Sequence, residues 1–532
     1  MSYDQHHQIS GTFIQHLINQ GFSRHRPVAH FDDFEVSELD LTRLKLNVGW
    51  FVPFIVPRHL ASADDITSTQ ISKFWRDVER HLRGHQKIKI IVVDGYAHLS
   101  EHDPSRVEFE EKGVVIWDKR VMRTITHVDD PHAKFKLISK GLLDVVGRGP
   151  LSPYVSGRPA LGGRFFGRST HLRHILSSES NCTILGNRRI GKTSLLKEIK
   201  ERLKLRGYRT AEVYGATVRS NVDFVTQLLN ELGEYRNAQQ VVKNKYHATS
   251  LPRWIKHIAT KDPVAVFVDE LDHILELDAQ QGHVLTHMLR EIFESNAHCR
   301  IFFAGFRRVM SERQNLGSPL FNFTRPIELQ GFSREETYEM VVKPLSHLGI
   351  DVEHSDLPTH IYLTTAGQPE HIQIFCAELI SFYEENNRIP QAEDLVRRVM
   401  DSTEYKQKVR GAFLSNTNSY EELLCYLLIA EAESSGQHQW YEFGPLDVNR
   451  VLKTVGKVIP LRDIMSLSAN LMVSGIIQRV PGDSIDRYRF SSPLLMEYLS
   501  NLDLNFCIEK ALEKIQEYDL YVYDTVQEDP DI

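Results

Sequence analysis

Short apolar runs alternate with stretches of helical spacing in the first part of the chain. The runs at 51–57, in KIIVVDG and at 113–118 are separated by helical stretches around 68–83 and 131–145. Apolar runs of about four to eight residues are typical of buried strands, whereas apolar residues three and four positions apart are typical of amphipathic helices. The alternation therefore predicts a small α/β domain with a parallel sheet at the N-terminus.

A second set of apolar runs starts near residue 182, and residues that can do chemistry follow each run. The run TIL ends before Gly186, the run VAVFV ends before Asp269, and the run IFFAG ends shortly before Arg307. After the first of these runs, apolar residues recur at helical spacing at Leu195, Leu196, Ile199 and Leu203. An α/β sheet binds its ligands beyond the ends of its strands, so this pattern predicts a three-layer α/β core with a site at that edge.

The segment between the first of these strands and its helix reads GNRRIGKTS, which matches the spacing GxxxxGK[ST]. Gly186 and Gly191 permit a tight turn, so that backbone N–H groups and the next helix N-terminus converge on phosphates. Lys192 is expected to reach the β and γ phosphates, and Thr193 is expected to hold Mg²⁺. The loop residues of the predicted site are Gly186, Asn187, Arg188, Arg189, Ile190, Gly191, Lys192, Thr193 and Ser194. Strand, loop and helix together predict a P-loop NTPase core that binds a nucleoside triphosphate, rather than an unliganded glycine-rich turn.

Two carboxylates follow the strand VAVFV. Asp269 is expected to bind Mg²⁺ together with Thr193, and Glu270 is expected to accept a proton from the attacking water. An alternative interpretation is that the acidic residues only cap the helix that follows. Asp272, three positions further on, is expected to be such a helix cap and not a catalytic residue.

Arg307 and Arg308 follow the third strand, which is expected to end at Gly305. If the strands lie side by side, one arginine falls near the γ-phosphate and can stabilise or sense its charge, and Arg307 is the preferred candidate. The alternative is that both arginines face solvent or form salt bridges. Arg325 is a weaker candidate for the same role.

Length, charge and cysteine content exclude several classes of protein. The chain has 532 residues, of which 41% are hydrophobic, and its formal net charge is -7. This length suits about three domains, and the acidic balance argues against a protein that coats nucleic acid. The five cysteines are scattered, without the close pairs of zinc or redox sites, and predict reduced thiols. No run of about 18 apolar residues is present, so we expect a cytoplasmic protein with no membrane partner.

The C-terminal part predicts the outline of a winged helix. LRDIMSLSANLMVSGIIQRV, a Pro481-Gly482-Asp483 turn and RYRFSSPLLMEYL predict a helix, a strand, a tight turn, a second strand and a final helix. Two hypotheses remain open for this module: it contacts DNA phosphates, or it packs against the core and locks a closed state. The arginines available for DNA contact are Arg462, Arg479, Arg487 and Arg489. The acidic end after Lys514 is expected to be frayed.

The N-terminal domain is expected to be a sensor or an effector. Asp94 and Asp118 each follow an apolar strand and are candidates for an acidic site of nuclease or receiver type. No lysine at nuclease spacing completes such a site, so its chemistry is left open.

Five segments of the chain resemble one known family. SPYVSGRPALGGRFFGRSTHL, GNRRIGKTSLL, VFVDELD, IFFAGFRR and TTAGQPEHIQIFCAEL occur in this order over about 150–400. In this order they resemble the signal-transduction ATPases with numerous domains (STAND), in their archaeal-type ATPase branch of the AAA+ group. The resemblance implies that Phe166, Gly167 and Arg168 lie by an adenine base and that Pro369 closes over it from a helical lid. It further implies that ATP is the substrate and Mg²⁺ the cofactor. Gly167 and Phe166 suit this role, because glycine permits close backbone approach and phenylalanine offers an apolar surface.

The resulting domain prediction divides the chain at composition changes and at these motifs. The Gly- and Pro-rich stretch GRGPLSPYVSGRPALGGRFFG suits a linker on a domain surface. The predicted parts are the N-terminal α/β domain (1–146), the linker (147–164), the P-loop ATPase core (165–335), the helical lid (336–415), the winged helix (416–505) and an acidic tail (506–532).

The sequence thus predicts an ATP-binding and ATP-hydrolysing switch that couples nucleotide state to signalling or defence. The catalytic set is Lys192, Asp269, Glu270 and Arg307, and the expected partners are ATP and a protein or a second copy of the chain. One alternative is a DNA-handling ATPase of the origin-recognition kind that uses its winged helix. Another is a nucleotide-gated scaffold or host-defence effector in which the first domain is the active part.

Overall fold

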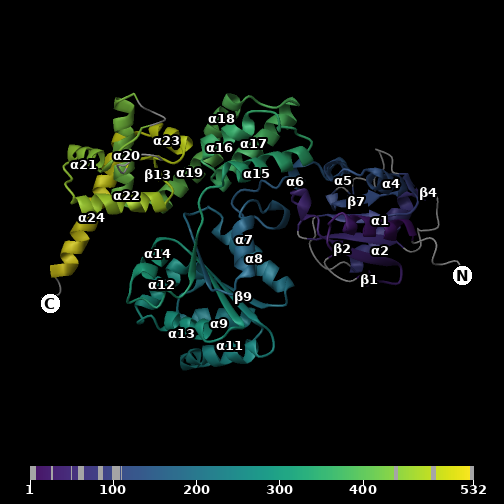
Figure 1. The fold of residues 1–532 in the computed structure, drawn as a ribbon, viewed down its shortest axis with the longest axis horizontal. Helices are drawn as coiled ribbons and strands as arrows, with labels where there is room; N and C mark the ends of the chain where they lie inside the picture. Colours follow the sequence, from purple (N-terminus) through teal and green to yellow (C-terminus); the bar gives the residue numbers. More distant parts are fainter. Residues whose placement is uncertain are drawn as a thin grey trace. The chain divides into compact units, whose positions relative to one another are not determined.

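The computed structural model describes residues 8–24, 28–49, 51–57, 65–81, 88–98, 108–109, 111–436, 441–480 and 487–527. These residues form two compact units, which Figure 1 shows in the colours of the sequence. Unit 1 comprises Met1–Gly167, Tyr338–Pro358 and Cys376–Ala392. Unit 2 comprises Arg168–Thr337, Thr359–Phe375 and Glu393–Ile532. This division cuts α15 (Arg334–His347) and α17 (Pro369–Asn386), and the domain bounds drawn from the sequence remain a prediction.

Unit 1 contains a five-stranded sheet of order β1-β2-β3-β5-β7. The strands are β1 (Ala29–His30), β2 (Phe34–Leu39), β3 (Val52–Pro57), β5 (Lys89–Val92) and β7 (Val114–Trp117). The three strands predicted from their apolar runs are parallel, as expected, but β1 and β2 add antiparallel pairs. The sheet is therefore mixed, and the prediction of a parallel sheet holds only for β3, β5 and β7.

Helices cover this sheet and supply much of its core. They are α1 (Gln8–Asn19), α2 (Ser68–His81), α4 (Lys119–His127), α5 (Pro131–Val146) and α6 (Arg148–Leu151), with short turns η1 (Thr42–Leu44) and η2 (Gly162–Arg164). The two predicted helices are confirmed as α2 and α5. A small parallel pair, β4 (Asp65–Thr67) with β6 (Tyr96–His98), completes the unit. One apolar cluster joins sheet and helix, with Val36, Ile55 and Ile91 packed against Trp75 and Val78 of α2.

Part of the predicted linker over 147–164 is buried in unit 1, although the prediction places this stretch on a domain surface. Leu151 and Tyr154 are buried, and the Tyr154 hydroxyl donates to the Met340 carbonyl at 2.8 Å. Glycine and proline composition correctly predicted the lack of a long helix here. It gave no sign of burial, because the partners of this stretch lie far along the chain.

Unit 2 contains a second five-stranded sheet, of order β12-β8-β11-β10-β9, in which every neighbouring pair is parallel. The strands are β8 (Cys182–Leu185), β9 (Arg209–Tyr214), β10 (Val264–Asp269), β11 (Cys299–Gly305) and β12 (Arg325–Glu328). β11 lies between β8 and β10, and Leu185 is in register with Gly305. The register therefore brings the ends of the three chemically marked strands to one edge of the sheet, as the sequence predicts.

Helices lie on both faces of this sheet. Val264, Val266 and Val268 share a core with α9, α11, α12 and α13, and α8 also contacts β8 to β11. The bounds are α7 (Ser169–Ser177), α8 (Lys192–Leu205), α9 (Asn221–Glu231), α10 (Tyr235–Lys243), α11 (Leu251–Ala259), α12 (Leu271–Ala279), α13 (Val284–Glu294) and α14 (Arg307–Gln314), with η3 (Gly215–Thr217) and η4 (Lys245–Ser250). The predicted stripe of α8 is buried at Leu195, Leu196, Ile199 and Leu203. The predicted α/β core with a parallel sheet is confirmed.

The remainder of the chain is mainly helical. Its elements are α16 (Leu357–Thr365), α18 (Ala392–Asp401), α19 (Thr403–Asn416), α20 (Ser419–Ser434), α21 (Pro445–Thr454), α22 (Leu461–Val473), β13 (Ile477–Arg479), β14 (Tyr488–Phe490), α23 (Pro493–Ser500) and α24 (Leu504–Gln527). β13 and β14 form an antiparallel pair, in the predicted order of helix, strand, strand and helix. The predicted Pro481-Gly482-Asp483 turn lies outside the described residues.

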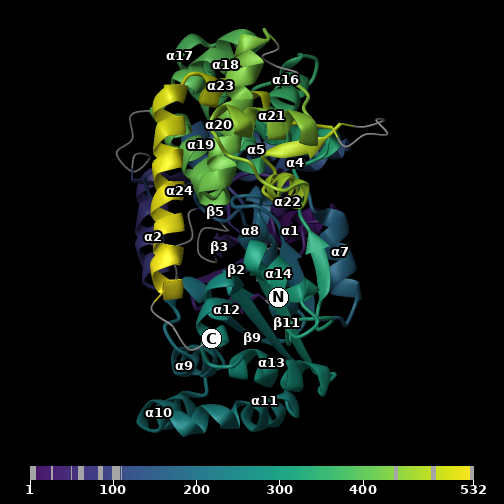
Figure 2. The same ribbon diagram turned by 90° about the vertical axis from the view of Figure 1, so that its left-hand side faces the viewer.

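The acidic end is helical rather than frayed as far as Gln527. α24, the long yellow helix in Figure 2, lies beside α20. Ala511 and Ile515 are buried, and the Lys514 ammonium lies 3.0 Å from a carboxylate oxygen of Glu422 on α20. This packing was missed because the prediction weighed the charge of the segment and not its apolar positions. No helix in the described ranges is long and apolar enough to cross a bilayer.

Candidate nucleotide-binding site

The predicted phosphate loop connects β8 to α8, which begins at Lys192. Gly186 has φ 153°, and a Cβ there would stand 2.9 Å from the Leu329 carbonyl oxygen, so only glycine fits. The Lys192 ammonium donates to the carbonyl oxygens of Gly186 at 2.8 Å and Asn187 at 2.9 Å. Burial lowers the pKa of Lys192 to about 8, against the opposing effect of Asp269. A phosphate group beside this ammonium would favour its charged form.

Asp269 ends β10 and is 2% exposed. The Thr193 hydroxyl donates to Oδ2 of Asp269 at 2.7 Å, and the Glu270 backbone N–H donates to Oδ1 at 3.0 Å. Burial raises the pKa of Asp269, and these two hydrogen bonds oppose that effect. A hydroxyl and a carboxylate side by side form an oxygen donor set of the kind that Mg²⁺ takes when nucleotide phosphates complete its shell. In the described part of the chain, no group of three His, Cys, Asp or Glu side chains forms another candidate metal site.

Glu270 stands at the turn from β10 into α12, with a left-handed backbone at φ 51°. A Cβ on Gly215 would lie 2.2 Å from the Glu270 carbonyl oxygen, so the chain after β9 passes in direct contact with this turn. Tyr214 ends β9 in register with Asp269. Partial burial and the neighbouring Glu270 carboxylate raise the pKa of Tyr214 to about 12. Tyr214 is therefore a site residue that no sequence motif indicates.

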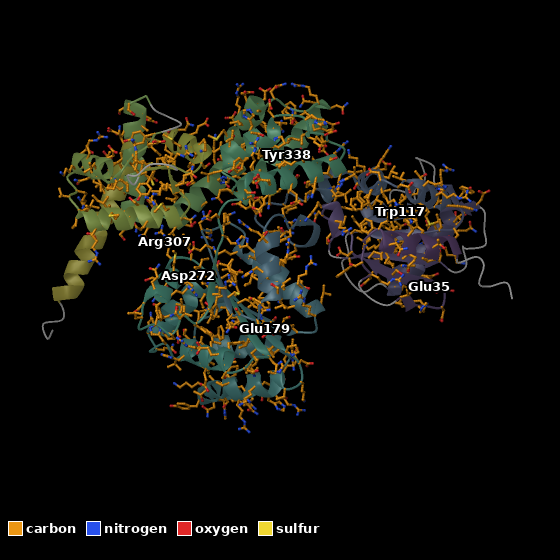
Figure 3. All side chains as sticks on the ribbon, viewed as in Figure 1. Glu35, Trp117, Glu179, Asp272, Arg307 and Tyr338 are labelled. Atoms are coloured by element: carbon orange, nitrogen blue, oxygen red, sulfur yellow. The ribbon has the colours of Figure 1, made fainter. Side chains whose placement is uncertain are left out.

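Asp272 has the structural role expected of it, but for a different helix. Its carboxylate accepts from the backbone N–H groups of Phe306 at 2.8 Å, Arg308 at 3.0 Å and Val309 at 3.2 Å. It thus caps α14 and not α12, the helix in which it lies. Figure 3 shows Asp272 and Arg307 at the same end of the sheet.

Arg307 follows β11, as predicted, and its guanidinium is held by the C-terminal part of unit 2. Nη1 donates to Oε1 of Glu421 at 3.0 Å, and Nη2 lies 2.8 Å from Oε2. Nη2 also donates to the Asn416 carbonyl and to the Ser474 hydroxyl. Phe306 lies beside both cations, with its ring centre 5.5 Å from the Arg307 guanidinium and 5.7 Å from the Lys192 ammonium.

The phosphate loop contacts the same C-terminal residues. The Asn187 side chain donates to the Ser474 carbonyl at 2.9 Å, and the Arg188 backbone N–H donates to Oδ1 of Asn416 at 3.3 Å. The Ser474 hydroxyl donates to the Asn416 carbonyl at 2.9 Å. We call Asn416, Glu421 and Ser474 the latch residues. None was predicted, and the only local signal is the Asn-x-x-Glu capping pattern of 418–421, which identifies a helix start and not a partner.

A cavity of about 820 Å³ lies beside the loop within unit 2, a size that suits a nucleotide. Its lining includes Arg168, Gly186, Asn187, Arg188, Arg189, Ile190, Glu336, Gln368, Glu370 and His371. The Arg168 backbone N–H donates to Glu336 at 2.7 Å, and its guanidinium lies 4.8 Å from the Phe332 ring centre. Arg189 pairs with Glu370 in the first turn of α17.

The lining of this cavity does not include the other predicted base contacts, Phe166, Gly167 and Pro369. Pro369 begins α17 but does not line the cavity, whereas its neighbours Gln368 and Glu370 do. Phe166 and Gly167 belong to unit 1, where the Lys45 ammonium lies 5.0 Å from the Phe166 ring centre. Their contact with a base remains a prediction.

Three candidate groups outside this site have structural partners. Asp94 accepts from the Ser10 backbone N–H at 2.8 Å, and Asp118 caps α4. Arg487 donates to the Glu442 carbonyl at 3.1 Å. These contacts occupy Asp94 and Asp118, the candidates for an acidic site, and Arg487, a candidate for contact with DNA phosphates.

The sheet, the loop and the paired strand ends define a P-loop NTPase fold. Residues 173–309 match the model of a protein family described as AAA domain. A search of the curated proteins finds no match.

Solved structures that match part of this chain include a Walker-type ATPase of Pyrococcus abyssi, at 16% identity and TM-score 0.46 over 65% of this chain and 99% of that one. The ORC2 protein of Aeropyrum pernix in its ADPNP-ADP complexes is 14% identical, with TM-score 0.46 over 68% of this chain and 98% of that one. The RuvB Holliday junction branch migration motor of Thermotoga maritima is 14% identical, with TM-score 0.34 over 61% and 93% of the two chains.

Proposed function

We propose that this chain is an ATP-binding and ATP-hydrolysing molecular switch of the STAND type, with Mg²⁺ as cofactor. The switch couples the nucleotide state of the phosphate loop to the C-terminal part of unit 2. Its output is signalling or defence through a protein partner or a second copy of the chain, and the N-terminal α/β domain acts as sensor or effector.

The roles of the site residues follow from their chemistry. Lys192 neutralises charge on the β and γ phosphates, and the loop N–H groups bind the phosphate oxygens. Thr193 and Asp269 would hold Mg²⁺, which would offset the negative charge of the phosphates. Glu270, close to them at the end of β10, orients a water molecule and accepts its proton.

One observation carries the switch: the phosphate loop and Arg307 both hydrogen-bond to the latch residues. Arg307 has a fixed number of N–H donors, so the donors that bind Glu421 cannot bind a γ-phosphate at the same time. Bound ATP competes for Arg307 and for the Arg188 N–H, and so releases 416–421 and 474–475 from the loop. Hydrolysis restores the closed state.

The experiment compares the parent protein with Glu270→Gln. We expect the variant to bind ATP with the parent affinity and to lose at least about a hundredfold in turnover, since general-base catalysis supplies a factor of that size. Hydrogen exchange then tests the switch: ATP with Mg²⁺ should increase exchange at the start of α20 and the end of α22, and ADP should not. If Glu270→Gln hydrolyses ATP at the parent rate, Glu270 is not the general base. If ATP with Mg²⁺ leaves hydrogen exchange unchanged, the latch residues do not respond to the nucleotide.

The rival function is DNA binding through a winged helix formed by α22, β13, β14 and α23. The hydrogen bond from the Asn187 side chain to the Ser474 carbonyl, at the end of α22, supports a packing role for this module instead. A DNA titration at low and moderate salt, repeated with Arg487→Ala and Arg489→Ala, separates the two functions, because phosphate contacts make affinity depend on salt.

A further inference from the structure

The segment between β9 and β10 carries a charge opposite to that of the whole chain. From residue 235 to residue 261 the sequence contains six lysine and arginine residues and no aspartate or glutamate, although the chain has a formal net charge of -7. The six are Arg236, Lys243, Lys245, Arg253, Lys256 and Lys261, and all are exposed. Among the described residues, none of these six cations forms an ion pair with a carboxylate. Their charge is thus available to a partner.

The fold presents these cations on the outer faces of consecutive elements. α10 buries Ala238 and Val241, which leaves Arg236 and Lys243, seven positions apart, on an exposed face. α11 buries Leu251, Ile255, Ile258 and Ala259 and exposes Arg253 and Lys256. η4 links the two helices, and Figure 2 shows α10 and α11 end to end along one edge of unit 2. We call the exposed faces of α10, η4 and α11 the basic surface.

Large apolar side chains stand exposed among the cations. Tyr246 is 75% exposed, Tyr235 is 64% exposed and Val242 is 68% exposed. The Lys245 ammonium lies 5.9 Å from the Tyr246 ring centre. Exposed aromatic side chains at this density mark binding sites more often than ordinary surface, and cations beside them select a negatively charged partner.

We propose that the basic surface binds single-stranded nucleic acid, with the lysines and arginines on the phosphates and Tyr235 and Tyr246 stacked on bases. Unpaired bases offer flat faces to tyrosine rings, whereas a duplex conceals those faces between stacked pairs. An acidic protein segment offers carboxylates to the cations but no bases on which the two rings can stack. This surface is separate from the ATP site and from the arginines of β13 and β14, so it is a second function and does not rest on the switch.

The first test measures the electrostatic contribution. Fluorescence anisotropy of labelled oligothymidylate of about 20 nucleotides is followed with the full chain over a salt series. We expect tight binding at low salt, and a loss of about two units in the slope of log affinity against log salt when Lys243, Lys245 and Lys256 are replaced together by alanine. The matched control replaces Lys73, Lys136 and Lys140, which are also exposed and lie in unit 1, and should keep the parent slope.

The second test measures stacking, which distinguishes nucleic acid from an acidic protein. Tyr235→Ala with Tyr246→Ala should weaken binding about tenfold or more at fixed salt and leave the salt slope unchanged. Tyr338→Ala, at another exposed tyrosine, should have no effect. Oligouridylate should bind comparably, and a duplex of equal length should bind more weakly. Parent affinity in the double tyrosine variant, or polyglutamate binding as tight as oligothymidylate, would overturn the proposal in favour of an acidic protein partner. If the variant with Lys243, Lys245 and Lys256 replaced by alanine keeps the parent salt slope, the basic surface does not bind the oligonucleotide.

Discussion

Arg307 and Glu421 form a two-point ion pair, with Nη1 to Oε1 at 3.0 Å and Nη2 to Oε2 at 2.8 Å. The Glu421 side chain is 0% exposed, and the Asn418 backbone N–H donates to the same carboxylate at 2.9 Å. A buried carboxylate needs such partners, because an unpaired charge there is strongly destabilising. The pair therefore couples the end of β11 to the start of α20.

Glu421→Gln is expected to tighten ATP binding several-fold. The neutral amide cannot form the ion pair, so Arg307 is released more often and the fraction of molecules competent to bind ATP rises. Calorimetric titration with ATP and Mg²⁺ measures the effect. Glu422→Gln is the matched control, since this neighbour pairs with Lys514 at 3.0 Å and not with the loop. Equal ATP affinities in Glu421→Gln and Glu422→Gln would show that the Arg307–Glu421 ion pair does not affect nucleotide binding.

Tyr214→Phe is expected to raise turnover several-fold at unchanged ATP affinity. The Glu270 carboxylate contributes to the raised pKa of Tyr214, so the hydroxyl lies close enough to compete with the water that Glu270 would orient. Phenylalanine keeps the ring and removes only the hydroxyl. Steady-state phosphate release measures turnover, and Tyr235→Phe, on the exposed face of α10, is the control. A fall in turnover would show instead that Tyr214 holds Glu270 in its working position.

The position of the candidate site residues at the strand ends could be predicted from the sequence because it is encoded locally. The loop spacing and the apolar runs before Asp269 and Arg307 determine both the elements and their shared edge. The partners of these residues could not be predicted in the same way. Glu421 lies 114 positions from Arg307, and Ser474 lies 287 positions from Asn187, with no motif that connects them.

The errors in the fold have a similar origin. β2 reads FEVSEL, in which polar residues interrupt the apolar ones, so it lacks the continuous run by which β3 was predicted. Its place in the sheet follows from pairing with β3, which is a tertiary contact. The stretch 147–164 was likewise judged by composition, although Tyr154 is buried by a contact with Met340.

Gly215→Ala is expected to lower both stability and turnover. A Cβ at this position stands 2.2 Å from the Glu270 carbonyl oxygen, so the turn that carries Glu270 must move. We expect a loss of about 2 kcal/mol or more in the free energy of unfolding, within the range for overpacking. Urea unfolding and ATP turnover are the measurements. Gly411→Ala in α19, where nothing lies within 4 Å of the added Cβ, should instead be neutral or stabilising by about 0.5 to 1 kcal/mol.

Lys192→Met is expected to change the pH dependence of stability. Burial lowers the pKa of Lys192 from 10.5 to about 8, so the charged form is less favourable in the folded chain than in the unfolded one. Between those two pH values the unfolded chain binds more protons, and Lys192 therefore makes stability rise with pH, while its cost is fully present below about pH 8. Methionine removes this cost, so the variant should be more stable than the parent at pH 7, by on the order of 1 kcal/mol because the side chain still meets solvent.

The difference between the two proteins should narrow as the pH rises from about 8 towards 10.5, which urea unfolding at a series of pH values measures. Other lysines and tyrosines titrate in the same range, and comparison of variant with parent cancels their contribution. ATP with Mg²⁺ should reverse the order at pH 7, because phosphates favour the charged ammonium and stabilise only the parent. A constant difference from pH 7 to pH 10 would show that the Lys192 ammonium is as well solvated in the loop as in the unfolded chain.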